Sequence, residues 1–331
     1  MRPPVRGLSA GIGWFLATVG LAALLATLPD YPRFVVSLTL VNAIAAMGVN
    51  LSMGYAGQVS VGHAGFAAIG AYTTAIMMGR LGVSFWATIP VGGALALLCG
   101  ILIGLPALKL TPLYIAMVTF GFGQVVNLVS LNWVDLTNGP NGLPVPAIGL
   151  GRYVFSPESF SYVIAASFLL LFWIAGNLVR SRMGRGFLAI RDSEVAAESM
   201  GVNLAKYKTI AFAVGAFYGG LSGALYAGLS NYVNPDAFIF PVSVLYLTMN
   251  VVGGMGTLAG PLVGALIFTV MPEVLRGFAE YKEFLSGGLL LLFLVFFPEG
   301  LVGMLDRAAE KLFRRSGRSA PAGTASATDV A

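Results

Sequence analysis

The polar residues that could do chemistry in this chain are few, and they cluster inside apolar sequence. The first cluster is GYAGQVSVGHAG (Gly54–Gly65, the first glycine segment), which lies within Phe34–Gly79, a stretch without Asp, Glu, Lys or Arg. Irregular backbone at membrane depth is tolerated only where protein buries it or where it lines a wet cavity. We therefore predict a broken helix beside a translocation pathway, with close helix packing as the alternative. The glycines concerned are Gly54, Gly57, Gly62 and Gly65.

A second glycine segment, VGGMGTLAGP (Val252–Pro261), interrupts another apolar run. An offset of 200 residues pairs Asn50 with Asn250 and Gly54 with Gly254. Paired interrupted helices in the two halves of a chain point to a transport site. The sequence thus predicts an internal repeat with a break in each half. The glycines of the second break are Gly253, Gly254 and Gly256, and the predicted pathway side chains are Asn50, Gln58, Ser60, His63, Gln124 and Asn250.

His63 is the only histidine of the chain. An ionisable group inside a membrane span is by default a functional hypothesis. The firm spans contain no Asp or Glu, so a proton relay through His63 would lack a second member. Two interpretations stay open: a neutral, hydrogen-bonded side chain near the pathway, and a purely structural one. Cys99 is the only cysteine, which leaves no disulfide, redox or metal framework.

The longest polar loop, Arg180–Lys208, holds six cations and three acids. Asp192 or Ser193 can cap a short helix within it, and Gly201 can end that helix. So short a helix is unstable alone, and we expect it to pack on another surface. Composition does not decide between a docking helix and a positively charged topological anchor.

The elements that must position these residues are membrane helices. Hydrophobic residues make up 57% of the 331 and charged residues 10%, against about 25% charged in soluble proteins. A helix that spans a bilayer needs roughly 20 mostly apolar residues. We predict an all-α polytopic membrane protein of about ten transmembrane helices, with broken or re-entrant glycine-rich segments. The charge-free stretches are Ala10–Leu28, Phe34–Gly79, Leu81–Leu108, Leu110–Val134, Ser159–Val179, Thr209–Pro235, Ala237–Pro272 and Phe284–Pro298.

The distribution of positive charge predicts the orientation. With ten spans, 14 of the 19 Lys and Arg residues fall in segments on the side of the N-terminus and 5 on the other side. Cytoplasmic loops carry the excess of Lys and Arg, so both termini are predicted to be cytoplasmic. The net charge of +5 then needs no nucleic-acid partner. Residues 1–305 form the predicted transmembrane domain, and residues 306–331 form a cytoplasmic tail that is largely disordered from Ser316.

Five ordered motifs resemble one family. They are GYAGQVSVGHAGFAAIGAY, LYIAMVTFGFGQ, LTNGPNGL, GRGFLAIRDSEVAAESMGVNLAKYK and GGMGTLAGPLVGA. Together they resemble the permease subunits, of LivM type, of bacterial inner-membrane ABC importers for branched-chain amino acids. The resemblance covers nearly the whole chain up to about Leu305.

The resemblance implies that the Arg180–Lys208 loop carries a coupling helix that fits a groove on an ATPase, related to the pattern E-A-A-x-x-x-G. Ala196, Ala197 and Gly201 have that spacing, while Val195 takes the glutamate position and Glu194 precedes it. We expect both alanines to face the ATPase. The implied coupling residues are Arg185, Arg191, Glu194, Ala196, Ala197, Glu198 and Gly201.

The resemblance also implies partners: a LivH-type permease, two ATP-binding cassette subunits and a periplasmic amino-acid-binding protein. ATP and Mg would reside on the ATPase subunits. No lysine of this chain follows a glycine, so it has no G-K-[ST] phosphate loop, and we expect a transport subunit and not an enzyme.

The function predicted from the sequence is import of branched-chain amino acids through the bacterial inner membrane by alternating access. A urea or amide importer permease is the nearest alternative. An ion-coupled secondary transporter is another, although no carboxylate lies in the firm spans. An intramembrane serine protease is a weak third, because Gly220–Gly223 matches G-x-S-G but the single histidine lies far away in the sequence.

Overall fold

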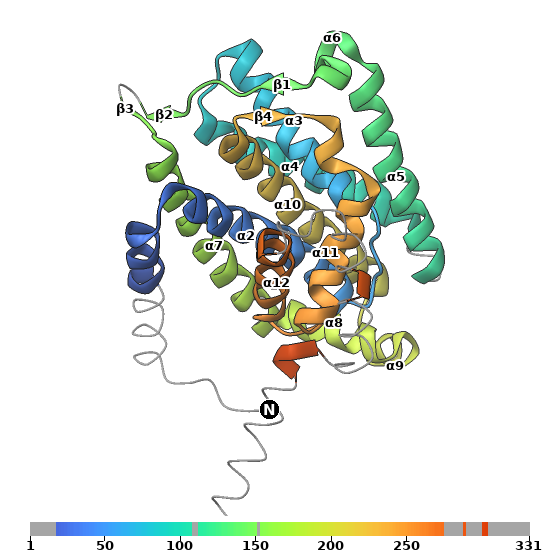
Figure 1. Cartoon of the computed structure of the whole chain (residues 1–331). Coiled ribbons are helices and arrows are strands. Elements are labelled where there is room, and N and C mark those ends of the chain that lie inside the picture. The colour runs from blue at the N-terminus through green and yellow to red at the C-terminus, as the bar shows by residue number, and fades with distance from the viewer. Residues whose placement is uncertain (1–17, 108–111, 151–152, 275–286, 289–299, 304–331) are drawn as a thin grey trace, which may run out of the picture.

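The chain folds as a bundle of apolar helices (Figure 1). The structure, a computed structural model, describes residues 18–107, 112–150, 153–274, 287–288 and 300–303. Six helices in these ranges are long and apolar enough to cross a membrane. The predicted span Phe284–Pro298 falls almost wholly outside the described residues, so the count of ten stays a prediction.

The helix bounds agree with most of the charge-free stretches. Phe34–Gly79 holds two helices, as its length requires, and Ala237–Pro272 holds two shorter ones. The main helices are α2 (Asp30–Val49), α3 (His63–Leu81), α4 (Phe85–Ala107), α5 (Pro112–Asn132), α7 (Pro157–Arg180), α10 (Leu204–Ser230), α11 (Phe240–Gly253) and α12 (Gly260–Val274), after an apolar helix Thr18–Thr27. The shorter elements are the π-helix η1 (Asn50–Tyr55), α6 (Val134–Thr137), the 3-10 helices η2 (Gly139–Asn141) and η3 (Pro235–Phe238), α8 (Arg182–Asp192) and α9 (Glu194–Ser199).

Helix α10 forms the centre of the bundle and packs against α2, α3 and α4. Its small residues allow this, since lipid provides no hydrophobic drive and close backbone contact must supply the attraction. A Cβ at Gly215 would lie 2.7 Å from the carbonyl oxygen of Gly48, and a Cβ at Gly70 would overlap that of Gly220. The G-x-S-G string is thus part of this helix contact, because a Cβ at Gly223 would also overlap the Ala67 carbonyl of α3. Ser222 is buried and donates its hydroxyl to the Gly219 carbonyl of its own helix.

Four two-residue strands join the loops at the end of the bundle opposite α8 and α9 (Figure 1). Strand β1 (Leu143–Pro144) pairs antiparallel with β4 (Tyr232–Val233), and β2 (Gly149–Leu150) pairs with β3 (Tyr153–Val154). The all-α prediction omitted these strands. Turn-rich loop sequence gives no alternating pattern over two residues, yet its backbone groups still need partners. The β1–β4 pair ties the loop after α5 to the loop after α10.

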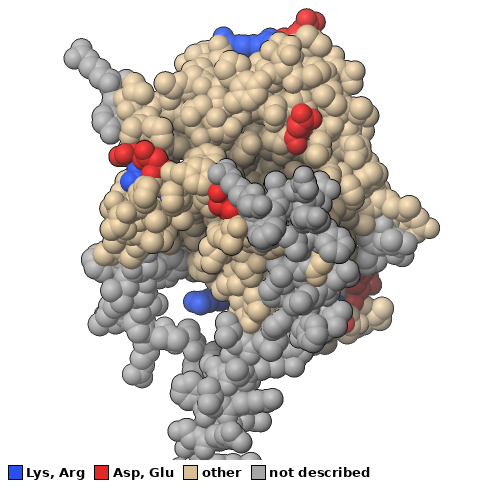
Figure 2. All heavy atoms as spheres, viewed as in Figure 1, with Lys and Arg blue, Asp and Glu red and all other residues tan. Residues whose placement is uncertain are grey.

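On the described part of the face in Figure 2, charged side chains are few and scattered over a mostly uncharged surface. Large apolar residues are exposed along α4, α5 and α7, among them Leu102, Met117 and Leu170. A soluble monomer rarely exposes so large an apolar area, whereas lipid or a membrane partner covers it without cost. The exposed surface therefore agrees with a membrane-embedded bundle.

Candidate functional site

The first glycine segment is a true interruption between two helices. Helix α2 widens into η1 and loses regular structure at Ala56–Gly62 before α3 begins at His63. Side chains from other helices satisfy the freed backbone: Ser243 of α11 accepts from the Ala64 amide at 2.9 Å, and Thr119 of α5 accepts from the Val61 amide at 3.0 Å. Neighbouring helices thus supply hydrogen-bond partners to the backbone of this break.

The second glycine segment lies against the first. Asn50 in η1 donates its side-chain amide to the Thr257 carbonyl at 2.7 Å and accepts from the Gly256 amide at 2.9 Å. Asn250 in α11 donates in turn to the Ala46 carbonyl of α2 at 2.9 Å. The two asparagines that the offset of 200 residues pairs therefore make reciprocal contacts, each reaching the opposite half. Gly253 ends α11, Gly254 caps it, and Gly256 follows with φ +74°.

Arg191, in the last turn of α8, meets both glycine segments. Its Nη1 donates to the Gly54 carbonyl, and a Cβ at Gly256 would overlap that same nitrogen. A Cβ at Gly57, which has φ +71°, would lie 3.5 Å from the Arg191 Cα. The resemblance implies Arg191 as an ATPase-coupling residue, which stays a prediction; within this chain its guanidinium contacts both breaks. The candidate functional site is this junction of α8 with both segments.

Three polar side chains of the first glycine segment are buried without a partner among the described residues. These are the side-chain oxygen of Gln58, the hydroxyl of Ser60 and the two ring nitrogens of His63, none of which makes a hydrogen bond of ordinary geometry. Buried polar groups are normally paired with protein or with water, and each exception calls for an explanation. His63 is 1% exposed and stacks edge-to-face on Phe66 at 5.6 Å. The tight packing of His63 agrees with a purely structural role. Its ring nitrogens have no hydrogen-bond partner among the described residues, so a role near the pathway also stays open.

Two glycines of the first segment make close helix contacts. A Cβ at Gly62 would overlap the Thr119 carbonyl of α5, and one at Gly65 would lie 3.1 Å from the Cα of Gly123. At Gly62 and Gly65 the glycines therefore serve close packing between helices, which was the alternative to a pathway. Gln124, half-buried on α5, lies at the edge of this contact.

The Arg180–Lys208 loop contains two short helices, where the sequence predicted one. Ser181 caps α8 by accepting from the Met183 amide at 3.1 Å, and Ser193 caps α9 by accepting from the Ala196 amide at 3.3 Å. Asp192 ends α8 and caps nothing. Gly201 follows α9 with φ +81°, so the predicted helix end at this glycine is confirmed, in a left-handed conformation.

The orientation of α9 corrects one prediction. Ala197 is only 3% exposed because it faces the chain itself, and it cannot present its side chain to a partner. Val195 in α9 and Met200, which follows α9, are apolar and are 77% and 85% exposed. Ala196 and Glu198 are exposed beside them, and Arg185 is exposed on α8.

An ion pair that the sequence analysis missed attaches α9 to the central helix. Lys208 of α10 is buried, and its ammonium lies 2.6 Å from a carboxylate oxygen of the half-exposed Glu194. The two residues are 14 positions apart on different helices, so no helical spacing indicated the contact. The implied contact of Glu194 with an ATPase would compete with this pair.

Removing the carboxylate should cost more than removing the amine. Glu194→Gln leaves the buried Lys208 ammonium without its counter-charge, which we expect to destabilise the attachment of α9 by about 1–3 kcal/mol. Lys208→Met leaves only a half-exposed carboxylate that water can solvate, so its cost should be smaller. Limited proteolysis of the loop in detergent measures this difference, and equal cleavage rates for both variants would contradict it.

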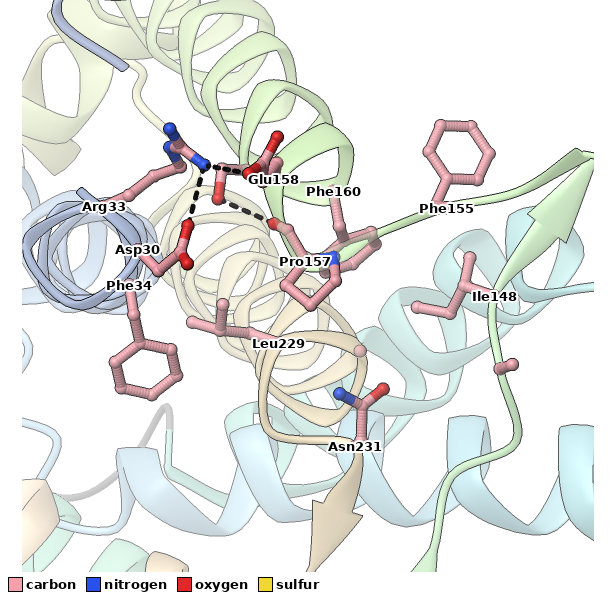
Figure 3. A pocket seen from close by; sticks show the side chains of 13 residues that line it. Asp30, Arg33, Phe34, Ile148, Phe155, Pro157, Glu158, Phe160, Leu229 and Asn231 are labelled. Atoms are coloured by element: carbon pink, nitrogen blue, oxygen red, sulfur yellow. Dashed lines mark hydrogen bonds and ion pairs between the residues drawn. The ribbon is translucent and has the colours of Figure 1, made fainter. Parts of the chain in front are cut away.

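A separate cavity of about 130 Å³ lies between α2, the start of α7 and the end of α10 (Figure 3). Its charged lining suits an amino acid at first sight, because Arg33 lies beside Asp30 and Glu158 with apolar side chains around them. Arg33, however, pairs with both carboxylates at 3.3 Å and also donates to the carbonyls of Leu25 and Leu28. Its guanidinium is thus committed to joining the first helices, and the cavity is not assigned a ligand.

Long apolar helices joined through buried polar contacts are typical of a multi-pass membrane protein. The sequence matches the family described as the permease component of branched-chain amino acid transport systems, over residues 31–294. The chain therefore belongs to this family, and the resemblance predicted from the motifs is confirmed.

Relatives of this chain differ in what their names say they transport. The chain is 34% identical over 295 residues to the high-affinity branched-chain amino acid transport system permease protein LivM of Escherichia coli (strain K12), covering 82% of this chain and 69% of that protein. It is 25% identical over 283 residues to the LivH permease protein of the same strain, covering 79% and 91%. It is 24% identical over 286 residues to that strain's galactose/methyl galactoside import permease protein MglC, covering 80% and 82%.

Proposed function

We propose that this chain is the LivM-type membrane subunit of an ATP-driven importer for branched-chain amino acids. The observation that carries the proposal is the 34% identity to a LivM protein across 82% of the chain. The similarity to LivH supports a hetero-pair of permeases, because both halves of such a pair would derive from one fold. Two ATPase subunits bind ATP and Mg, a periplasmic binding protein delivers the amino acid, and this chain catalyses no reaction.

The substrate pathway runs beside the first glycine segment. The unpaired polar atoms of Gln58, Ser60 and His63 support this assignment, since water or a passing substrate would satisfy them. Asn50 and Asn250 hold the two breaks together and take no part in selection. Transport then requires that the junction differ between the inward-open and outward-open states.

The ATPase contacts the exposed apolar side chains of Val195 in α9 and Met200 at its end. Their exposure supports this role, because an apolar pair on a loop otherwise rich in charge marks an interaction surface. The buried side chain of Ala197 packs against the chain itself and takes no part in the contact with the ATPase.

Reconstitution tests the function directly. The chain is purified with its partner permease, ATPase and binding subunits and placed in proteoliposomes with ATP inside or outside. Leucine uptake that needs both ATP and the binding protein supports the proposal. Uptake driven by an ion gradient alone, or a binding protein that delivers urea or an amide and not leucine, would contradict it.

The chain lies in a bacterial inner membrane with both termini in the cytoplasm. In a Cys99→Ala background, we expect cysteines at Asn141 and Asp236 to react with an impermeant thiol reagent in intact cells. Cysteines at Arg185 and Arg315 should react only after the membrane is opened. The excess of Lys and Arg on one side is the physical reason. Labelling of a cysteine at Ser193 from outside would reverse the assignment of the loop.

A further inference from the structure

We propose that Arg191 is the residue through which movement of α8 reaches both glycine segments. This inference rests on the proposed function, because it assigns a mechanical role within the importer cycle. Its structural basis is that one guanidinium group contacts two breaks that come from opposite halves of the chain.

The contacts of Arg191 are specific to the irregular backbone. The Gly54 carbonyl accepts from its Nη1 at the point where η1 ends. Gly256 lies against the same nitrogen and donates its own amide to Asn50. Any shift of Arg191 therefore moves the carbonyl of the first break and presses on the backbone of the second.

The helix that carries Arg191 is able to transmit a displacement. Phe187 and Ile190 are fully or almost fully buried, so α8 moves together with the bundle side it packs on. Ser193 forms the joint to α9, and Glu194 attaches α9 to Lys208. A displacement of α9 is thus transmitted to Arg191 through Ser193, the one residue between α9 and α8.

An arginine suits this position because its planar fork can hold more than one backbone group in fixed directions. Lysine at the same place offers one compact ammonium group and can hold the Gly54 carbonyl without filling the space beside Gly256. Arg182, at the other end of α8, is exposed and serves as the matched control.

The reconstituted complex tests the proposal by comparing leucine uptake with ATP hydrolysis. For Arg191→Gln we expect normal assembly and ATP hydrolysis within about twofold of the wild type, with uptake reduced roughly tenfold or more. Arg191→Lys should restore part of the uptake. Arg182→Gln, which removes the same charge, should leave both rates unchanged. The signature is therefore a rise in ATP consumed per leucine imported.

A second variant approaches the contact from the other side. Gly256→Ala and Gly82→Ala both place a side chain at positive φ, but a Cβ at Gly82 meets nothing within 4 Å. We expect only Gly256→Ala to raise the ATP consumed per leucine. If Arg191→Gln fails to assemble, this pair of variants decides the question.

Three results of these transport and hydrolysis assays would overturn the proposal. Normal uptake by Arg191→Gln would show that the contact is dispensable. A parallel fall of uptake and ATP hydrolysis, or equal effects of the two alanine variants, would show a merely structural role.

A substrate-independent readout separates this inference from the proposed function. A cysteine at Ser60, in the Cys99→Ala background, should change its labelling rate when ATP and vanadate are added, and Arg191→Gln should abolish that change. If the wild-type complex imports no leucine while this difference persists, the substrate class is wrong and the role of Arg191 stands. If the labelling change survives in Arg191→Gln, the role of Arg191 falls.

Discussion

Gly62→Leu is expected to remove nearly all uptake and to lower the yield of folded protein. A Cβ at Gly62 would overlap the Thr119 carbonyl, which belongs to backbone and cannot rotate away. Overpacking usually costs 1–3 kcal/mol, and a clash with backbone places this variant at about 3 kcal/mol or more. The φ of Gly62 is −111°, so contact alone causes the effect and not backbone strain.

Gly20→Leu is the matched control for this variant. It makes the same change in an apolar helix, but a Cβ at Gly20 meets nothing within 4 Å. Uptake at equal expression and the melting temperature in detergent measure the difference. Comparable values for the two variants would show that the contact with α5 is not needed.

Asn50→Asp is expected to have the second largest effect. The substitution keeps the size of the side chain but replaces the donor that holds the Thr257 carbonyl at 2.7 Å with an acceptor. Asn50 is only 3% exposed, so a buried carboxylate that keeps the Gly256 amide but turns its other oxygen on the Thr257 carbonyl should cost about 3 kcal/mol or more. We expect a lower melting temperature and loss of uptake.

Asn132→Asp serves as the control for this change. Asn132 is exposed at the end of α5, and its amide donates to the Leu128 carbonyl of its own helix. A carboxylate there remains solvated, so the melting temperature should change little. Equal losses in both variants would mean that Asn50 does not join the two breaks.

The sequence predicted those features of the fold and site that depend on local chemistry. Charge-free length predicted two helices in Phe34–Gly79, and glycine content predicted the interruptions at both segments. Capping chemistry predicted Ser193 as one of two candidate caps and Gly201 as the end of α9. These features arise within a few residues, where backbone preference and hydrogen bonding act directly.

The features that escaped prediction depend on contacts between distant residues. Arg191 and the Gly54 carbonyl are 137 positions apart, and nothing near either residue indicates the other. Ala197 fits a known spacing, but which face of α9 packs inward is decided by Lys208 and the bundle around it. The periodicity of a sequence predicts that a helix has an apolar face, but it does not predict which helix packs against that face.

The reciprocal asparagines have a consequence for synthesis of the protein. Asn50 meets its partner 207 residues later, and Asn250 reaches back 204 residues to α2. At about 5–20 residues per second, a ribosome takes roughly 10–40 s to cover that distance. During this interval the first break sits in or near the membrane with its polar groups unpaired by the second half. The nascent chain therefore depends on water or the insertion machinery to shelter the first break until the second is made.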